Sequence, residues 1–398
     1  MSTYDLIEHR IKHRSQIPAN EGVEVELPVR EYKATHGNDR EPVLMLHGRS
    51  VPALPGFDLA PAPGENPIRY SWAQELAKAG YDVFIMDLQG SGRSPRPEMD
   101  VPCNTNPAQQ ASVLVPNPLS EPCTPPPPYA FQLGNSESEW AEVKTVVKFI
   151  RKLPEADKPI HFVGWSAAAF VMGPYALQYP DDVRSLFLLA PMFPPKGPWS
   201  EKADQPFGRP QGAQTLPLPG FPMHVTSKRG FQAALSGPAG LWEPGIDELA
   251  WEACMRDDHE GSKWGPIVNG EPAGVLRYRN TYWWGWNNHT VPLMRENKYI
   301  LGGRVPVLIL YGANDRTANS PTPMPDNLNF SVPALYKAIA GPKKLMFCFE
   351  GSGHSLVWET AAEAIHDYSK HWLKKYKVGG HDNGSFFREL DGNLIPLP

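Results

Sequence analysis

The chain has 398 residues, of which 41% are hydrophobic and 20% are charged, a composition typical of a globular protein with enough apolar side chains for a core. Its 38 lysines and arginines face 43 aspartates and glutamates without a long basic run, so we expect no nucleic-acid partner. The first residues mix acids and bases where a signal peptide needs an apolar core, and no continuous apolar span reaches the ~20 residues that cross a bilayer. We therefore expect a cytoplasmic protein without a membrane span.

The first half of the chain alternates strand and helix patterns. Residues 22–36 alternate in polarity, which suggests an antiparallel pair of strands at the start of a sheet. Continuous apolar runs at 41–48 and 81–87 are typical of strands buried on both faces, and helical periodicity at 70–80 separates them. The alternation continues with a helix at 137–153, a strand at 158–166, a helix at 167–179 and a strand at 183–191. Such alternation predicts parallel strands joined by right-handed crossovers.

Two segments interrupt this alternation. Residues 95–133 are dense in proline, with PPPP at 125–128, and have neither the strand nor the helix period, so we expect a long, stiff loop insertion. Residues 193–303 hold many prolines and glycines and are predicted to form an inserted, Trp-rich and largely helical cap. The core domain is therefore predicted at 1–192 and 304–398. The tryptophans of the cap are Trp199, Trp242, Trp251, Trp264, Trp283, Trp284 and Trp286.

The strand and helix pattern returns after the cap. It predicts a strand at 305–315, a helix at 331–341, a strand at 343–355 and an amphipathic helix at 357–376. An Asp-Gly pair within 384–398 indicates a terminal hairpin. Together with the first half, this pattern predicts an α/β fold built on a mostly parallel, doubly wound sheet.

The four cysteines, at 103, 123, 254 and 348, include no CxxC pair and are too few for a disulfide scaffold. Cys348 lies in an apolar strand pattern and is expected in the core. Cys103 and Cys123 flank a loop and would be bridged in an oxidising compartment, which the sequence leaves open.

Patterns for metals and nucleotides are incomplete in this chain. His366 and His371 are five residues apart on a predicted helix, so they do not share a face as the ligands of HExxH do. The GSGRSP turn at 90–95 lacks the third glycine of a dinucleotide fingerprint, and no phosphate-loop lysine motif occurs. We therefore expect neither a metal site nor a cofactor.

One serine stands at a sharp turn between a strand pattern and a row of alanines, in GWSAA at 164–168. A serine hydroxyl is a weak nucleophile unless an imidazole takes its proton and a carboxylate orients that imidazole. Asp315 follows one later strand and His354 follows the next. Taken singly, each residue also fits a structural role: Ser166 as a helix N-cap, the aspartate as a turn former and the histidine as a surface loop residue. Their shared position at the ends of core strands predicts a catalytic triad.

These motifs resemble the α/β-hydrolase superfamily, and the likeness covers residues 40–192 and 303–376. GWSAA stands where that family has its nucleophile elbow, with Ala168 in place of the second glycine of G-x-S-x-G. The chain order of nucleophile, acid and histidine also agrees with the family. The resemblance implies a nucleophile, an orienting acid and a general base at Ser166, Asp315 and His354.

The resemblance also implies an oxyanion hole made of the backbone N–H groups of Arg49 and Ala167. The Arg49 guanidinium is a further candidate, as a contact for a substrate carboxylate. Two other acids compete for the role of Asp315. Glu350 lies close to His354 along the same strand end, and Asp87 precedes a glycine-rich turn where a structural role is expected.

The combined pattern predicts a serine hydrolase that cleaves a carboxylic ester, a lactone or a related acyl bond of a bulky apolar or aromatic small molecule. An aromatic cap above the serine favours such substrates over long-chain lipids. The substrate contacts that we expect are Trp165, Trp283, Trp284 and Trp286. A C–C bond hydrolase, an amidase, or a hydrolase-like receptor with little turnover remain alternatives, and a homodimer is possible.

Overall fold

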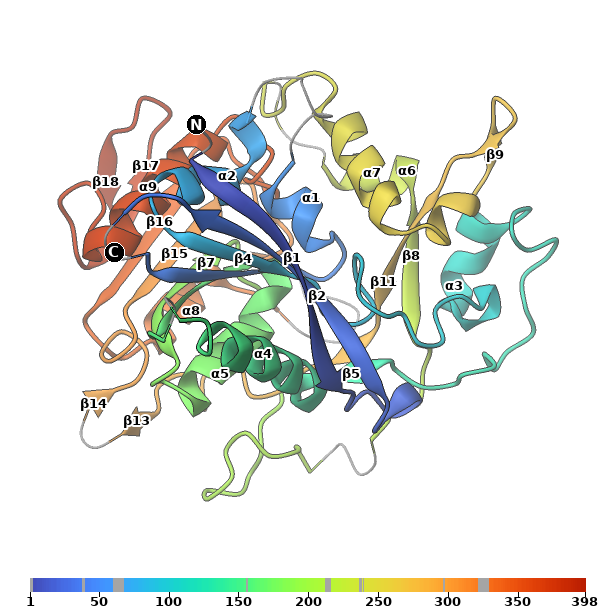
Figure 1. The fold of residues 1–398 in the computed structure, drawn as a ribbon, viewed down its shortest axis with the longest axis horizontal. Coiled ribbons are helices and arrows are strands. Elements are labelled where there is room, and N and C mark those ends of the chain that lie inside the picture. Colours follow the sequence, from blue (N-terminus) through green and yellow to red (C-terminus); the bar gives the residue numbers. More distant parts are fainter. Residues whose placement is uncertain are drawn as a thin grey trace.

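The computed structural model describes residues 3–37, 40–59, 68–154, 157–211, 216–235, 238, 240–295, 298–320 and 329–398. Its centre is one ten-stranded sheet (Figure 1). In spatial order the strands are β1 (Tyr4–Arg14), β2 (Glu24–Ala34), β4 (Asp82–Met86), β3 (Pro42–Leu46), β6 (Ile160–Trp165), β7 (Val183–Leu189), β15 (Val307–Gly312), β16 (Lys344–Phe349), β17 (Gly384–Arg388) and β18 (Leu394–Pro396). All residues of β3, β4, β6 and β15 are buried, as expected for strands covered on both faces.

The strands from β4 to β17 pair in parallel, and the pairs at the two edges are antiparallel. This confirms the mostly parallel sheet, and the expected terminal hairpin forms its last two strands. The expected pair of strands within residues 22–36 is wrong, because this segment forms the single strand β2 and its antiparallel partner is β1. Charged residues such as Glu8, Arg10 and Lys12 point to solvent from this edge strand, which masked its strand character in the sequence.

Helices cover both faces of the sheet. The core helices are α1 (Ala53–Phe57), α2 (Trp72–Lys78), α4 (Ser136–Ile150), α5 (Ala169–Gln178), α8 (Val332–Ala338) and α9 (Ala362–Lys375). Figure 1 shows α4 beside α5 below the sheet and α2 beside α9 at the upper left. The start of α4 is fixed by a capping box in which Asn135 and Ser138 bond each other's backbone N–H. Among the described helices, none combines the length and the apolar character needed to cross a bilayer.

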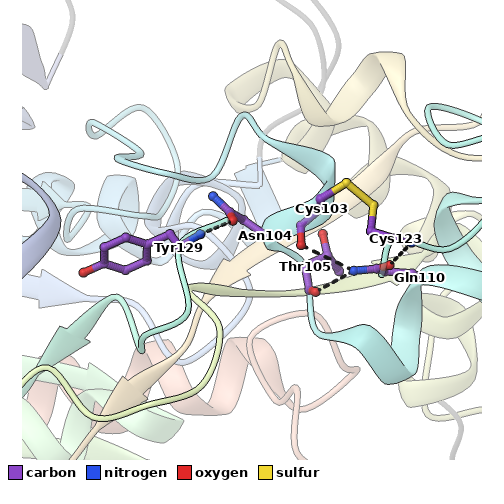
Figure 2. Close-up of a disulfide and its surroundings, with 6 residues drawn as sticks. All are labelled: Cys103, Asn104, Thr105, Gln110, Cys123 and Tyr129. Carbon is purple, nitrogen blue, oxygen red and sulfur yellow. Dashed lines mark hydrogen bonds between the residues drawn. A yellow bond between two sulfur atoms is a disulfide. The ribbon is translucent and has the colours of Figure 1, made fainter. Parts of the chain in front are cut away.

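The proline-rich segment contains short helical turns, η3 (Pro102–Asn104), α3 (Pro107–Gln109) and the π-turn η4 (Gln110–Leu114). Cys103 and Cys123 are joined in a disulfide, with Cα atoms 5.6 Å apart. The buried Gln110 amide lies beside it and bonds the carbonyls of Cys103 and Thr105 and the N–H of Cys123 (Figure 2). The side chain of one glutamine thus ties both ends of the bridged loop.

The segment expected to form the cap, 193–303, contains strands as well as helices. Its elements are β8 (Met223–Ser227), α6 (Lys228–Ala234), α7 (Ile246–Asp257), η6 (Gly261–Lys263), β9 (Ile267–Val268), β10 (Glu271–Pro272), β11 (Val275–Arg279), β12 (Thr281–Tyr282), β13 (Met294–Arg295) and β14 (Lys298–Tyr299). Strands β8 and β11 form a two-stranded antiparallel sheet. Side chains from this small sheet and from the proline-rich segment share a second hydrophobic core, which includes Met99, Leu114, Met223 and Val275. The two insertions therefore fold together.

Two arginines of β11 carry their charges into this region. The Arg277 guanidinium is 1% exposed and bonds the Asp258 carboxylate, with Nη2 and Oδ1 2.5 Å apart. Arg279 is 3% exposed, and its Nε lies 2.7 Å from Glu139 of α4. A buried charge is tolerated only when it is paired and hydrogen-bonded. The first pair joins two segments within the inserted region, and the second joins this region to α4 of the core.

The disulfide is expected to stabilise the folded protein. A Cys103→Ser, Cys123→Ser double variant should have a free energy of unfolding lower by about 3 kcal/mol, because the bridge closes a loop of 20 residues and restricts the unfolded chain. Urea denaturation with and without dithiothreitol measures the difference. The double variant serves as its own control because its midpoint should not respond to the reductant. A wild-type midpoint that also ignores the reductant would contradict the expectation.

Candidate active site

The candidate nucleophile stands where β6 turns into a helix. Ser166 begins the 3-10 turn η5 (Ser166–Ala168), which leads into α5, and its φ is 58°. A positive φ is rare and costly for a residue with a side chain. The tight turn requires small neighbours, because a Cβ added at Gly164 would lie 3.0 Å from the Cβ of Ala168. This packing explains why position 164 is a glycine opposite Ala168.

The structure brings Ser166, His354 and Asp315 together in one hydrogen-bonded chain. His354 Nε2 lies 2.9 Å from Ser166 Oγ, and His354 Nδ1 lies 2.9 Å from Asp315 Oδ2. The Asp315 side chain is fully buried, and the imidazole is 18% exposed. The other carboxylate oxygen of Asp315 accepts the N–H groups of Thr317 and Ala318, at 2.8 and 2.9 Å. The carboxylate is thus held so that only one of its oxygens faces the imidazole.

The loop after β3 touches the nucleophile. A Cβ added at Gly48 would lie 3.0 Å from Ser166 Cβ, so glycine is required for this approach. His47 accepts the Leu88 N–H at Nε2 and donates from Nδ1 to the Gly48 carbonyl. Burial and then the Arg279 charge hold the pKa of His47 well below its usual range, so the ring is neutral. Arg49, one of the two expected oxyanion-hole residues, follows directly on this loop.

The two competing acids have structural partners. Asp87 is buried and accepts the N–H of Ala53 at 2.8 Å, which ties β4 to the start of α1. Glu350 accepts the N–H of Leu390 at 2.9 Å and so holds the C-terminal hairpin. Of these three acids, only Asp315 bonds the imidazole of His354. No group of three or more His, Cys, Asp or Glu side chains suited to a metal occurs among the described residues.

A buried acid behind the histidine escaped the sequence analysis. Glu359 is 0% exposed, and its two carboxylate oxygens lie 3.1 and 3.0 Å from the N–H of Gly353, the residue before His354. Burial raises the pKa of Glu359 to about 7, and the hydrogen bond from Gly353 offsets only part of this rise. The next residue, Thr360, donates its N–H to Leu241 of the cap segment. Glu359 and His354 are joined by an irregular turn, so no periodicity marks their proximity.

The expected substrate tryptophans occupy different environments. Trp284 and Trp286 are each 1% exposed, and their indole N–H groups donate to the carbonyls of Phe207 and Met192. This burial does not fit the expectation that these two side chains contact substrate, because their aromatic faces are used in packing. Trp165 is also buried, and its indole N–H donates to the carbonyl of His354, so this side chain helps to hold the loop that carries the histidine.

Trp283 differs from the other three because it is only partly buried. Its ring stacks on Phe170 of α5, with centroids 4.7 Å apart and an interplanar angle of 12°. Its indole N–H donates to Glu139 at 2.7 Å. Phe170 belongs to α5 and lies four residues after Ser166 along the chain, so this stack is close in sequence to the nucleophile.

The fold and the motif together identify the family. The family model described as alpha/beta hydrolase fold matches residues 41–359. The chain belongs to the alpha/beta hydrolase family. This membership agrees with the order of the strands and with the elbow at Ser166, and it assigns the protein to a family of hydrolases. No curated protein matches the chain.

Three solved hydrolase structures are among those to which this chain is similar. The 2-hydroxy-6-oxo-6-phenylhexa-2,4-dienoate hydrolase from Rhodococcus sp. strain RHA1 is 14% identical, with a TM-score of 0.47, over 94% of this chain and 100% of that one. Carboxylesterase CesB from Bacillus subtilis is 12% identical, with a TM-score of 0.47, over 94% and 93%. The CarC serine hydrolase of carbazole degradation is 13% identical, with a TM-score of 0.47, over 93% and 99%. Similarity at this level says nothing of the substrate of this chain.

Proposed function

We propose that this alpha/beta hydrolase is a serine hydrolase that cleaves a carboxylic ester, a lactone or a related acyl bond of a small molecule. The observation that carries the proposal is the chain of two 2.9 Å hydrogen bonds from Asp315 through His354 to Ser166. The serine stands on a turn with positive φ that presents its hydroxyl at the end of β6. A nucleophile, a base and an orienting acid in this geometry are the groups that acyl transfer requires.

In the proposed mechanism, Ser166 Oγ attacks the carbonyl carbon while His354 Nε2 takes the hydroxyl proton. Asp315 accepts the Nδ1–H, fixes this tautomer and stabilises the imidazolium that forms. His354 then gives its proton to the leaving group, and an acyl-serine ester remains. Water, deprotonated by the same imidazole, releases the acid and restores the serine.

The negative charge that develops on the carbonyl oxygen needs fixed donors. We assign these donors to the backbone N–H groups of Ala167 and Arg49, which follow directly on Ser166 and on Gly48, the glycine packed against it. A single donor of this kind is worth roughly a hundredfold to a thousandfold in kcat. No cofactor takes part in this scheme.

For the substrate we keep the expectation of a bulky apolar or aromatic group, supported by the Trp283 and Phe170 stack. The test is hydrolysis of a panel of esters, lactones and amides with acyl groups of graded size. Faster turnover of aromatic esters or lactones than of long-chain lipids is the expected result. Cleavage of amides alone would favour an amidase, and binding without turnover of any compound would favour a receptor.

Glu359 is expected to affect the pH dependence of this activity. The Glu359→Gln variant keeps an oxygen for the Gly353 N–H but removes a charge that faces His354 and Asp315. Above its pKa of about 7, the carboxylate favours the protonated imidazole, which is inactive as a base. The acidic limb of kcat/KM should therefore move to lower pH in the variant, by less than about half a pH unit, because Glu359 is itself largely protonated below pH 7.

The measurement is a pH profile of kcat/KM with an aromatic ester. Glu359→Ala removes both the charge and the hydrogen-bond acceptor, so it should also lower kcat by releasing the turn that carries His354. Glu359→Gln should leave kcat closer to the wild-type value. Superimposable profiles of the wild type and Glu359→Gln would show that the carboxylate acts on stability alone.

The cytoplasmic location expected from the sequence remains a prediction, and the Cys103–Cys123 disulfide speaks against it. Such bridges persist mainly in oxidising compartments. The other two cysteines, Cys254 and Cys348, are free and buried. Alkylation of unfolded protein from its native cells, followed by mass spectrometry, distinguishes the two locations: two modified cysteines indicate an oxidising compartment and four indicate the cytoplasm.

A further inference from the structure

Arg49 lies where the core meets the inserted region. It follows Gly48, the residue packed against Ser166, and its side chain is half-buried. Its Nη2 donates to His224 Nε2 at 2.9 Å, and its guanidinium carbon lies 5.6 Å from the centre of the Tyr278 ring. His224 belongs to β8 and Tyr278 to β11, and their two rings are stacked. The guanidinium is therefore held between the loop beside the nucleophile and the small sheet of the cap.

The charge of Arg49 has no acidic partner among the described residues, in contrast to three arginines nearby. Arg277 and Arg279 bond buried carboxylates, and Arg96 lies 3.5 Å from Asp258. The only polar partner of the Arg49 guanidinium in the described part of the chain is the imidazole of His224. A half-buried cation without a counter-ion is less favourable than a paired one, and an anion bound from solution would neutralise its charge.

His224 does not supply the missing charge. Burial, followed by the charge of Arg49, lowers the pKa of His224 to about 4, so the ring is neutral at physiological pH. Its other nitrogen lies 3.3 Å from the amide nitrogen of Asn106 in the proline-rich segment. Three segments therefore converge on a cluster that carries one net positive charge, in which the Arg49–His224 hydrogen bond and the stack of His224 on Tyr278 connect the core to the inserted region.

We propose that Arg49 binds a carboxylate of the substrate, so that this enzyme prefers monoesters of dicarboxylic acids or similar acyl compounds with a free carboxylate. This inference rests on the proposed serine hydrolase activity and specifies its substrate class. The planar guanidinium matches a carboxylate with two parallel hydrogen bonds. With the reacting carbonyl at Ser166, the carboxylate lies on the side of the β3 loop and the cap sheet. The substrate carboxylate then serves as the counter-ion of the Arg49 guanidinium, for which the described residues provide no acidic group.

The test compares two aromatic esters that are identical except that one carries a terminal carboxylate and the other its methyl ester. Wild-type protein should show a higher kcat/KM for the carboxylate. Arg49→Gln removes the charge but keeps a hydrogen-bond donor, and it should lower the ratio of the two kcat/KM values by roughly tenfold to a hundredfold, mainly through KM. Arg49→Lys keeps the charge but lacks the planar guanidinium, so its ratio of kcat/KM values should lie between those of the wild type and Arg49→Gln. Added salt should raise KM for the carboxylate ester in the wild type and not in Arg49→Gln.

An equal loss on both esters in Arg49→Gln, with the ratio unchanged, would overturn the proposal and make Arg49 a tie between core and cap. Circular dichroism and the melting temperature show whether each variant folds, and Arg49→Lys carries the test if Arg49→Gln does not. If the wild type hydrolyses neither ester, the proposed hydrolase function fails separately. Calorimetric binding of the carboxylate and its methyl ester to Ser166→Ala, with and without Arg49→Gln, then decides the role of Arg49: weaker binding of the carboxylate alone supports it, and unchanged binding overturns it.

Discussion

Replacing Ser166 by alanine is expected to lower kcat by roughly a millionfold, to the limit set by the oxyanion hole and substrate binding. The reason is that Ser166 Oγ is the atom bonded to His354 Nε2 at 2.9 Å, and no other group at this position replaces its lone pair. The variant should also fail to react with a fluorophosphonate probe, which forms a covalent bond only with an activated serine. Kinetics with the best ester of the panel and the mass of the labelled protein measure both effects.

A matched control is Ser112→Ala, an exposed serine of the proline-rich segment that makes one bond to the carbonyl of Gln109. It should keep wild-type turnover and labelling. The melting temperature of Ser166→Ala should stay close to or above that of the wild type, because alanine keeps the Cβ that packs against Gly48 and removes only the hydroxyl. Persistent labelling at another residue in Ser166→Ala would place the nucleophile elsewhere.

Asp315→Asn is expected to lower kcat by about ten-thousandfold with little change in the fold. The N–H groups of Thr317 and Ala318 both point at Asp315 Oδ1, so the asparagine oxygen should take this position. Its NH₂ group then faces His354 Nδ1 and donates to it. The proton of the imidazole is thereby forced onto Nε2, toward Ser166, and the ring no longer serves as a base.

The control for this variant is Glu350→Gln, which alters the rival acid that bonds Leu390 and should change kcat less than twofold. The rate of fluorophosphonate labelling should fall with kcat in Asp315→Asn, since both depend on the same proton transfer. A loss of less than tenfold in Asp315→Asn, or a large loss in Glu350→Gln, would contradict the assignment of the orienting acid.

The sequence alone determined the parts of this protein that depend on local pattern. Apolar runs alternating with helical periodicity specified the parallel strands, because strands covered on both faces leave a continuous apolar signature. The positions of Ser166, Asp315 and His354 could be predicted to converge because each follows a strand of that sheet, and parallel strands end at one edge. The family resemblance of GWSAA added the order of the three groups.

Only the tertiary structure decided the features that depend on contacts between distant segments. The charged edge strand β1, the shared core of the two insertions and the burial of Trp284 and Trp286 result from long-range packing, which no periodicity records. The same holds for Glu359 behind the histidine and for the neutral partner of Arg49. The burial and the charge state of a side chain depend on neighbours brought from elsewhere in the chain. These two properties distinguish a tryptophan used in packing from an accessible one, and an arginine paired with an acid from one without an acidic partner.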